Sequence, residues 1–268
     1  MSSGKAFDEF LRQVCPPRDL GWRKYRRASK RKVMQRIREL GLKGLDEYAR
    51  YLDEHPKESE VLPNILRVTL SRFFRESEVW HKLAAEIVPG LLKSSQTYHT
   101  LQALSIGCCN GEEPYSLALL WKSGIQQRFP GAEIKITALD VDPSCLERAR
   151  AGMYSRKTLR EVPQHILDTW FHRESSGFFR LHPEIRNMVS FYPSDMLQEH
   201  LPGNQDLILC RYLVFTYFQG GKMQRVARRI ISSLSPSGCL VTGKKEELGL
   251  EHGNGLSSVP GMPVFYLT

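Results

Sequence analysis

The chain has 268 residues, of which 41% are hydrophobic, and this size suits a large domain that carries a smaller one. No apolar run approaches the roughly 20 residues of a membrane span, and the first residues show no apolar segment of signal-peptide length. These features argue against membrane insertion, and we expect a cytoplasmic protein. The six cysteines form no Cys-x-x-Cys pair and no histidine completes a zinc set, so we expect reduced thiols and no bound metal.

Positive charge is concentrated near the start of the chain. The net charge is +9, and residues 1–75 hold 18 Lys and Arg against 10 Asp and Glu. The densest part, residues 18–38, has ten basic residues and one acid, which predicts an acidic partner unless the charges only solvate a surface. We favour an acidic protein over nucleic acid, because only Trp22 and Tyr25 offer rings for stacking on bases.

The first third of the chain is predicted to be helical. Apolar residues recur there at spacings of three and four, for example at Val33, Ile37 and Leu40. The predicted helical stretches are 6–14, 30–41, 44–55 and 59–92. We expect residues 1–92 to form a basic helical domain that ends in a linker helix.

Residues 93–268 show a different pattern, in which short β-type runs alternate with helical stretches. Strands are predicted at 100–107, 133–142, 188–195, 205–213, 239–244 and 264–268, and helices at 113–129, 143–154 and 220–234. The alternation predicts an α/β domain with a Rossmann-like, doubly wound and mostly parallel sheet, whose ligand binds at the carboxyl ends of the strands. The last, short strand is a candidate for antiparallel pairing with its neighbour.

The alternation breaks down between residues 154 and 196. Within this region the segment 177–192 predicts short antiparallel strands. We therefore expect a small β insertion at about residues 170–192 of the main domain.

The stretch 104–116, LSIGCCNGEEPYS, places a loop between a buried strand and a helix. Gly107 and Gly111 allow a sharp turn and a close approach to a ligand, while Pro114 suits the first turn of a helix. The loop lacks a Lys-Ser/Thr ending, and two glutamates at a helix start would repel a phosphate. Glu113 instead suits a cationic ligand that also presents ribose hydroxyls, and S-adenosylmethionine meets that description. Cys108 and Cys109 are interpreted as small packing residues.

Two later strands add polar groups to the same edge of the predicted sheet. Asp140 ends the second strand, where an acid commonly binds ribose hydroxyls, and Arg211 comes after a later strand. These positions favour a nucleotide-type cofactor. The alternative is that the glutamates of the loop are helix caps and solvated charges.

Five motifs resemble those of the CheR-type methyltransferases and stand in the same order: LSRFFRE, GCCNGEEPYSLAL, ALDVDPSCLERARAGMY, DLILCR and LSPSGCLVTGKKE. The resemblance covers essentially the whole chain and implies a class I methyltransferase fold. It also implies transfer of a methyl group from S-adenosylmethionine to a glutamate side chain of a chemotaxis receptor, which gives a methyl ester.

The same resemblance, together with the loop glycines, implies a set of site residues. Those expected to bind the cofactor are Thr69, Ser71, Arg75, Gly107, Gly111, Glu113, Asp140, Asp195, Met196, Arg211 and Tyr212. Asp140 would hold the ribose, and Glu113 would face or support the methionine end. Arg75 and Tyr217 are the expected catalytic residues, the first orienting a carboxylate through a bidentate fork and the second donating a hydrogen bond near the transfer point. The basic N-terminal helices would dock an acidic protein substrate.

Three departures from the family pattern concern the acceptor. Tyr212 replaces the usual Asn, one extra residue comes before the Tyr217-Phe218 pair, and Lys244 and Lys245 replace a His-Ser pair. Two alternatives therefore stay open. One keeps the cofactor but uses a small-molecule or non-glutamate acceptor, and the other is a non-catalytic module that senses the cofactor or recognises a partner.

Overall fold

The computed structural model describes residues 3–14, 27–66, 71–94, 100–249 and 255–267. Within these ranges, no helix combines the length and the apolar character needed to cross a membrane.

The chain divides into two compact units. The smaller comprises residues 1–69 with 216–222, and the larger comprises residues 70–215 and 223–268. The expected boundary at residue 92 therefore differs from the division in the structure, because the helices that come after residue 70 belong to the larger unit.

Within its described residues before position 67, the smaller unit consists of the helices α1 (Ser3–Val14), α2 (Arg27–Glu39), α3 (Leu45–Glu54) and α4 (Pro56–Leu66). They lie where the apolar spacing predicted helices, and their apolar faces meet in a core that includes Phe10, Val33, Ile37 and Leu62. Of the basic stretch, residues 18–26 lie outside the described residues, and α2 carries the rest.

A buried carboxylate joins three helices of this unit. Glu58 of α4 accepts two hydrogen bonds of 2.8 Å from the guanidinium of Arg36 in α2, and one of 2.9 Å from the hydroxyl of Tyr48 in α3. Glu58 is only 7% exposed. Hydrogen bonding from Arg36 outweighs the opposing effect of burial and lowers the pKa of Glu58, so the carboxylate stays charged inside the unit.

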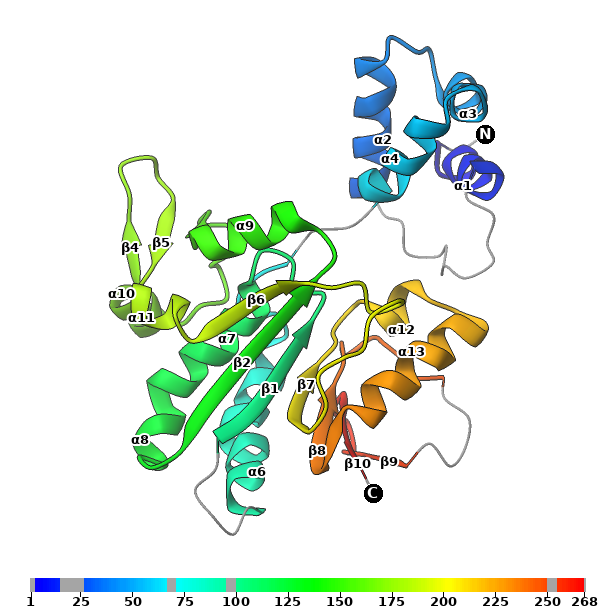
Figure 1. The fold of residues 1–268 in the computed structure, drawn as a ribbon. Coiled ribbons are helices and arrows are strands. Elements are labelled where there is room, and N and C mark those ends of the chain that lie inside the picture. Colours follow the sequence, from blue (N-terminus) through cyan, green and yellow to red (C-terminus); the bar gives the residue numbers. More distant parts are fainter. Residues whose placement is uncertain (1–2, 15–26, 67–70, 95–99, 250–254, 268) are drawn as a thin grey trace. The chain divides into compact units, whose positions relative to one another are not determined.

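The larger unit contains a seven-stranded sheet with the order β6–β2–β1–β7–β8–β10–β9 (Figure 1). Its strands are β1 (Thr100–Ile106), β2 (Glu133–Asp140), β6 (Val189–Pro193), β7 (Gln205–Leu209), β8 (Leu234–Val241), β9 (Leu256–Ser258) and β10 (Val264–Leu267). The first five strands in this order run parallel, and β10 pairs antiparallel with both β8 and β9. The predicted doubly wound sheet and the antiparallel last strand are thereby confirmed.

Helices alternate with these strands along the chain. They are α5 (Ser77–Lys82), α6 (Val88–Ser94), α7 (Glu112–Leu120), α8 (Gln126–Arg128), α9 (Pro143–Ala151), α12 (Val214–Tyr217) and α13 (Gly220–Ser232), with π-helical turns at Leu83–Ile87 and Trp121–Ile125. Trp80 and Ile87 pack in one core with Leu101 of β1 and Trp121. Five of the seven residues of β1 are buried, which is typical of a central parallel strand covered on both faces.

A second, three-stranded antiparallel sheet has the order β3–β5–β4, from β3 (Met153–Tyr154), β4 (Phe171–Arg173) and β5 (Phe179–Leu181). Two short helices accompany it, α10 (Gln164–Trp170) and α11 (Pro183–Arg186). The expected insertion at 170–192 needs a correction, because residues 189–193 form β6 and pair parallel with β2 in the main sheet. As the edge strand, β6 buries Val189 and Phe191 and exposes Ser190, and this alternation resembles that of an inserted antiparallel strand.

Replacing Glu58 with alanine removes the shared acceptor of Arg36 and Tyr48 and is expected to destabilise the smaller unit by about 2 kcal/mol. The measurement is hydrogen exchange of the amides in α2, α3 and α4, whose protection should fall by about thirtyfold. Glu54→Ala removes an exposed carboxylate from the neighbouring helix and serves as the control. Equal protection in the two variants would contradict the role of Glu58 in joining the three helices.

Candidate active site

Four neighbouring parallel strands end at one edge of the large sheet. The register pairs Asp140 of β2 with Pro193 of β6, Ile106 of β1 with Leu139 of β2, and Ser105 of β1 with Leu209 of β7. The strand order reverses between β1 and β7, so the loops after these strands flank the switch point where α/β sheets bind ligands.

The loop from Gly107 to Gly111 comes after β1 and is fastened to the end of β2. The backbone N–H groups of Gly107 and Cys108 donate to the carbonyl of Leu139, at 2.8 and 3.0 Å, and that of Cys109 donates to Asp140 Oδ2 at 2.8 Å. Gly107 has a φ of 73°, and a Cβ there would lie 2.5 Å from Leu213 Cδ2. The positive φ at 107 favours glycine, and the Leu213 side chain lies in the space that a Cβ would need.

Asp140 holds its own loop as well. Its Oδ1 accepts a 3.0 Å hydrogen bond from the backbone N–H of Asp142, so both carboxylate oxygens face backbone donors at the strand end. Asp142 instead caps α9, because it accepts from the backbone N–H and the hydroxyl of Ser144. The two acids at the end of β2 therefore have different roles: Asp140 holds the loop, and Asp142 caps the helix.

Glu113 lies in the first turn of α7, largely buried beside the end of β1. Its Oε1 accepts a 2.9 Å hydrogen bond from the hydroxyl of Ser105, and its Oε2 lies 3.8 Å from Arg211 Nη1. Burial raises the pKa of Glu113, against the opposing influence of Arg211. The carboxylate retains capacity to accept hydrogen bonds from a cationic ligand.

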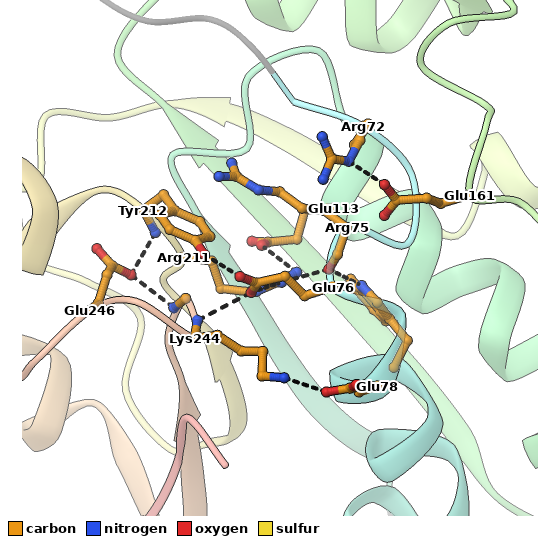
Figure 2. Close-up of polar contacts among 12 residues, drawn as sticks. Arg72, Arg75, Glu76, Glu78, Glu113, Glu161, Arg211, Tyr212, Lys244 and Glu246 are labelled. Carbon is orange, nitrogen blue, oxygen red and sulfur yellow. Dashed lines mark hydrogen bonds and ion pairs between the residues drawn. The ribbon is translucent and has the colours of Figure 1, made fainter. Parts of the chain in front are cut away.

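Arg211 lies just beyond β7, and its side chain is 3% exposed. One terminal nitrogen, Nη2, donates to Glu76 Oε2 at 2.8 Å and to the carbonyl of Arg75 at 2.6 Å (Figure 2). Within the described residues the buried Nε of Arg211 has no hydrogen-bond partner.

Glu76 is the centre of this polar network. Besides Arg211, it accepts hydrogen bonds from the hydroxyl of Tyr212 and, at 3.1 Å, from the backbone N–H of Lys244 (Figure 2). Its φ of 62° places it in the left-handed region, and its carboxylate makes no capping bond to α5. Glu76 was not among the predicted site residues, although it stands directly after Arg75 in the LSRFFRE motif.

Arg75 lies in the same segment, with its guanidinium carbon 3.7 Å from the centroid of the Tyr212 ring. Burial lowers the pKa of Arg75. In the described part of the chain the structure records no ion pair for this guanidinium, whereas the nearby Arg72 pairs with Glu161 at 2.6 Å.

Glu246, which lies beyond β8, is a second residue that sequence analysis missed. Its Oε2 accepts from the backbone N–H groups of Tyr212, at 2.6 Å, and Gly243, at 2.8 Å, and so ties the end of β8 to the end of β7. It is the acid of the GKKE motif, in which only Lys244 and Lys245 had drawn attention. The side chain of Lys244 is paired with Glu78.

The remaining predicted residues lie in several parts of the chain. Asp195 comes after β6 and accepts a 2.9 Å hydrogen bond from the backbone of Leu197, next to Met196. Gly111 precedes α7, and Ser71 is partly buried before Arg72. Thr69 lies outside the described residues. Tyr217 ends α12 within residues 216–222, which belong to the smaller unit, so its catalytic role stays a prediction.

The donors and acceptors at this edge fit S-adenosylmethionine. Glu113 offers a carboxylate for an ammonium group. The Nε–H of Arg211, which has no partner among the described residues, and the guanidinium of Arg75 offer donors for a carboxylate, and Asp140 stands where ribose hydroxyls bind. In these roles each residue remains a proposal.

Glu112 is the most deeply buried acid beside this loop, at 1% exposed. Its Oε1 lies 3.5 Å from Asn110 Nδ2, and its Oε2 has no hydrogen-bond partner among the described residues. Burial raises the pKa of Glu112 to about 7. This carboxyl group therefore changes its charge near neutral pH.

The sheet order, the glycine loop after the central strand and the acid after the next strand define a Rossmann-like α/β domain that binds a nucleotide-type cofactor. Residues 69–263 match the family model "CheR methyltransferase, SAM binding domain". The chain belongs to the CheR methyltransferase family, and it is an S-adenosylmethionine-dependent methyltransferase.

Three relatives show the extent of the similarity. The chain is 32% identical over 222 residues to the chemotaxis protein methyltransferase of Escherichia coli (strain K12), covering 80% of this chain and 74% of that protein. It is 30% identical over 220 residues to chemotaxis protein methyltransferase 2 of Pseudomonas aeruginosa, with coverages of 80% and 76%. It is also 27% identical over 220 residues to an uncharacterized 104.1 kDa protein of Rhodobacter capsulatus, covering 81% of this chain but only 23% of that protein.

Replacing Asp140 with asparagine keeps its shape but removes an acceptor from the loop and from the proposed ribose site. We expect the affinity for S-adenosylhomocysteine, measured by calorimetry, to fall at least about tenfold. Asp142→Asn is the control, because asparagine caps a helix as well as aspartate does, and its affinity should stay within about twofold. An unchanged affinity in Asp140→Asn would show that Asp140 does not contribute to cofactor binding.

Replacing Glu112 with glutamine tests the raised pKa of Glu112. The folded protein holds the proton of this carboxyl up to about pH 7, whereas the unfolded chain releases it near 4.5. The wild type should therefore lose about 2 to 3 kcal/mol of unfolding free energy between pH 5 and pH 8 relative to Glu112→Gln. Urea titrations of both proteins at the two pH values give this difference, and a constant difference would contradict the burial effect.

Proposed function

We propose that this enzyme methylates glutamate side chains of a chemotaxis-receptor-like protein and so forms methyl esters. Two relatives at 30% identity or more bear the name chemotaxis protein methyltransferase, which supports a receptor acceptor. A cytoplasmic site of action is part of this proposal.

The observation that carries this proposal is the state of Arg75. Its guanidinium is partly buried, lies on the ring of Tyr212 and forms no recorded ion pair within the described residues, next to a set of arginine and glutamate side chains that are paired. A partly buried cation without a carboxylate partner favours the binding of a carboxylate ligand. A glutamate side chain supplies that group.

The chemistry asks little of the protein beyond position. When bound, S-adenosylmethionine supplies an electrophilic methyl group on a sulfonium sulfur, which an ionised carboxylate attacks without a general base. Arg75 would hold the acceptor carboxylate through a bidentate fork, and Glu113 would hold the cationic end of the cofactor. Tyr217 would donate a hydrogen bond close to the transfer point.

The smaller unit is proposed to dock the acceptor. On α2, Arg31 and Arg38 are exposed, whereas Val33 and Ile37 face the core of the unit. The exposed arginines give this helix a basic surface that suits the acidic helices of a receptor signalling domain.

The test is incubation of the enzyme with methyl-labelled S-adenosylmethionine and the cytoplasmic domain of a chemotaxis receptor. We expect label in the protein that mild base releases as methanol, and no label when the acceptor glutamates are replaced by alanine. Label that survives base would favour a different acceptor group. Cofactor binding without transfer to any acceptor would favour a non-catalytic module.

A further inference from the structure

Tyr212 has a backbone conformation that a large residue seldom adopts. Its φ is 58°, in the left-handed region, which favours glycine and asparagine. The conformation is held by the backbone N–H of Tyr212, which donates to Glu246 Oε2 at 2.6 Å, while the same oxygen accepts from Gly243. An unfavourable conformation that is fixed in this way indicates a role for the side chain.

The ring of Tyr212 is held at two further points. A Cβ on Gly243 would lie 2.6 Å from ring atoms Cε2 and Cζ, so the ring occupies space that only glycine leaves open. At its far end the hydroxyl is hydrogen-bonded to Glu76 (Figure 2). The position of the ring is therefore determined by the segment after β8 and the segment before α5.

The fixed ring carries the guanidinium of Arg75 at 3.7 Å from its centroid. Stacking on an aromatic face uses the plane of a guanidinium and leaves its N–H edges available for hydrogen bonds. The backbone of Arg75 is fixed as well, because its carbonyl accepts from Arg211 Nη2 at 2.6 Å and from Trp80 Nε1 at 3.0 Å. The orientation of the side chain then depends on the ring.

We propose that Tyr212 is a positioning residue, whose ring aims the Arg75 guanidinium at a carboxylate in the active site. This proposal rests on the proposed function for the identity of the acceptor. The carboxylate belongs either to the acceptor glutamate or to the amino-acid end of the cofactor, and the two sources have the same chemistry. The position at which the chain departs from the family pattern thereby gains a role.

Two substitutions separate the ring from the hydroxyl and from the backbone. Tyr212→Asn removes the ring but tolerates the positive φ, so its effects do not come from backbone strain. Tyr212→Phe keeps the stacking face and loses only the bond to Glu76. Arg75→Lys keeps the charge but loses the planar group that stacks.

The first measurement does not need an acceptor. In protein labelled with 15N-arginine, the Nε–H resonance of Arg75, assigned with Arg75→Lys, should show the ring-current shift of a stacked guanidinium. We expect Tyr212→Phe to retain the shift and Tyr212→Asn to lose it. A resonance that is unchanged in Tyr212→Asn would overturn the proposal.

The second measurement is a double-mutant cycle on methyl transfer and on calorimetric affinity for S-adenosylhomocysteine. In the wild-type background, Tyr212→Asn should lower kcat/KM by about tenfold or more, and Tyr212→Phe should lower it by less than about threefold. In the Arg75→Lys background, Tyr212→Asn should have little further effect. The control pair uses Arg72→Lys, on the same segment but paired with Glu161, where the effects should multiply. If Tyr212→Asn lowers kcat/KM by the same factor in Arg75→Lys as in the wild type, the proposal is overturned.

The acceptor KM and the affinity for S-adenosylhomocysteine also show which molecule carries the carboxylate. A raised acceptor KM with unchanged affinity for S-adenosylhomocysteine assigns it to the acceptor, and a lowered affinity assigns it to the cofactor. If kcat, the acceptor KM and the affinity for S-adenosylhomocysteine are all unchanged in Tyr212→Asn, the positioning role is wrong. If no acceptor is methylated at all, the proposed function fails, while the resonance and the calorimetric cycle still decide the role of Tyr212.

Discussion

The polar side of the candidate active site depends on the carboxylate of Glu76. This one group accepts hydrogen bonds from Arg211, Tyr212 and Lys244, which lie beyond the ends of two different strands of the sheet. Burial favours the neutral form of Glu76, yet the bonds from Tyr212 and Arg211 outweigh it and hold the pKa below its ordinary value. A charged Glu76 neutralises Arg211 and keeps the segment before α5 at the carboxyl ends of β7 and β8.

Charge balance around Glu76 explains why two neighbouring arginines differ. Arg211 is almost fully buried and lies between Glu76 and Glu113, so its charge is compensated inside the protein. Arg75 is more exposed, and its cation rests on an aromatic face instead of a carboxylate. An internal ion pair is costly to separate, whereas a cation on a ring still gains by meeting an anion. The site thus divides its arginines into one that maintains the structure and one that is available to a ligand.

Periodicity and chain order were enough to predict the sheet and the residues that lie at the carboxyl ends of its strands. Alternating strands and helices indicated the parallel sheet, and Gly107, Glu113, Asp140 and Arg211 were placed at one edge because parallel strands share their carboxyl ends. The predicted β insertion wrongly included most of β6, because buried and exposed residues alternate along an edge strand as they do along an antiparallel strand. Glu76 and Glu246 were missed for another reason. Their partners lie 135 and 34 residues away in the chain, and no local pattern marks a tertiary contact.

The hydrogen atom that serves as the side chain of Gly243 limits how this active site can vary. Any β-carbon at 243 would occupy the volume of the Tyr212 ring. Positions 212 and 243 are therefore coupled, although 31 residues separate them: with the Tyr212 ring where it lies, any larger residue at 243 would force the ring or the backbone to shift. Glycine at 243 is thus a condition for the position that the Tyr212 ring occupies. A larger side chain at 243 would have to be removed before a tyrosine ring could occupy this space.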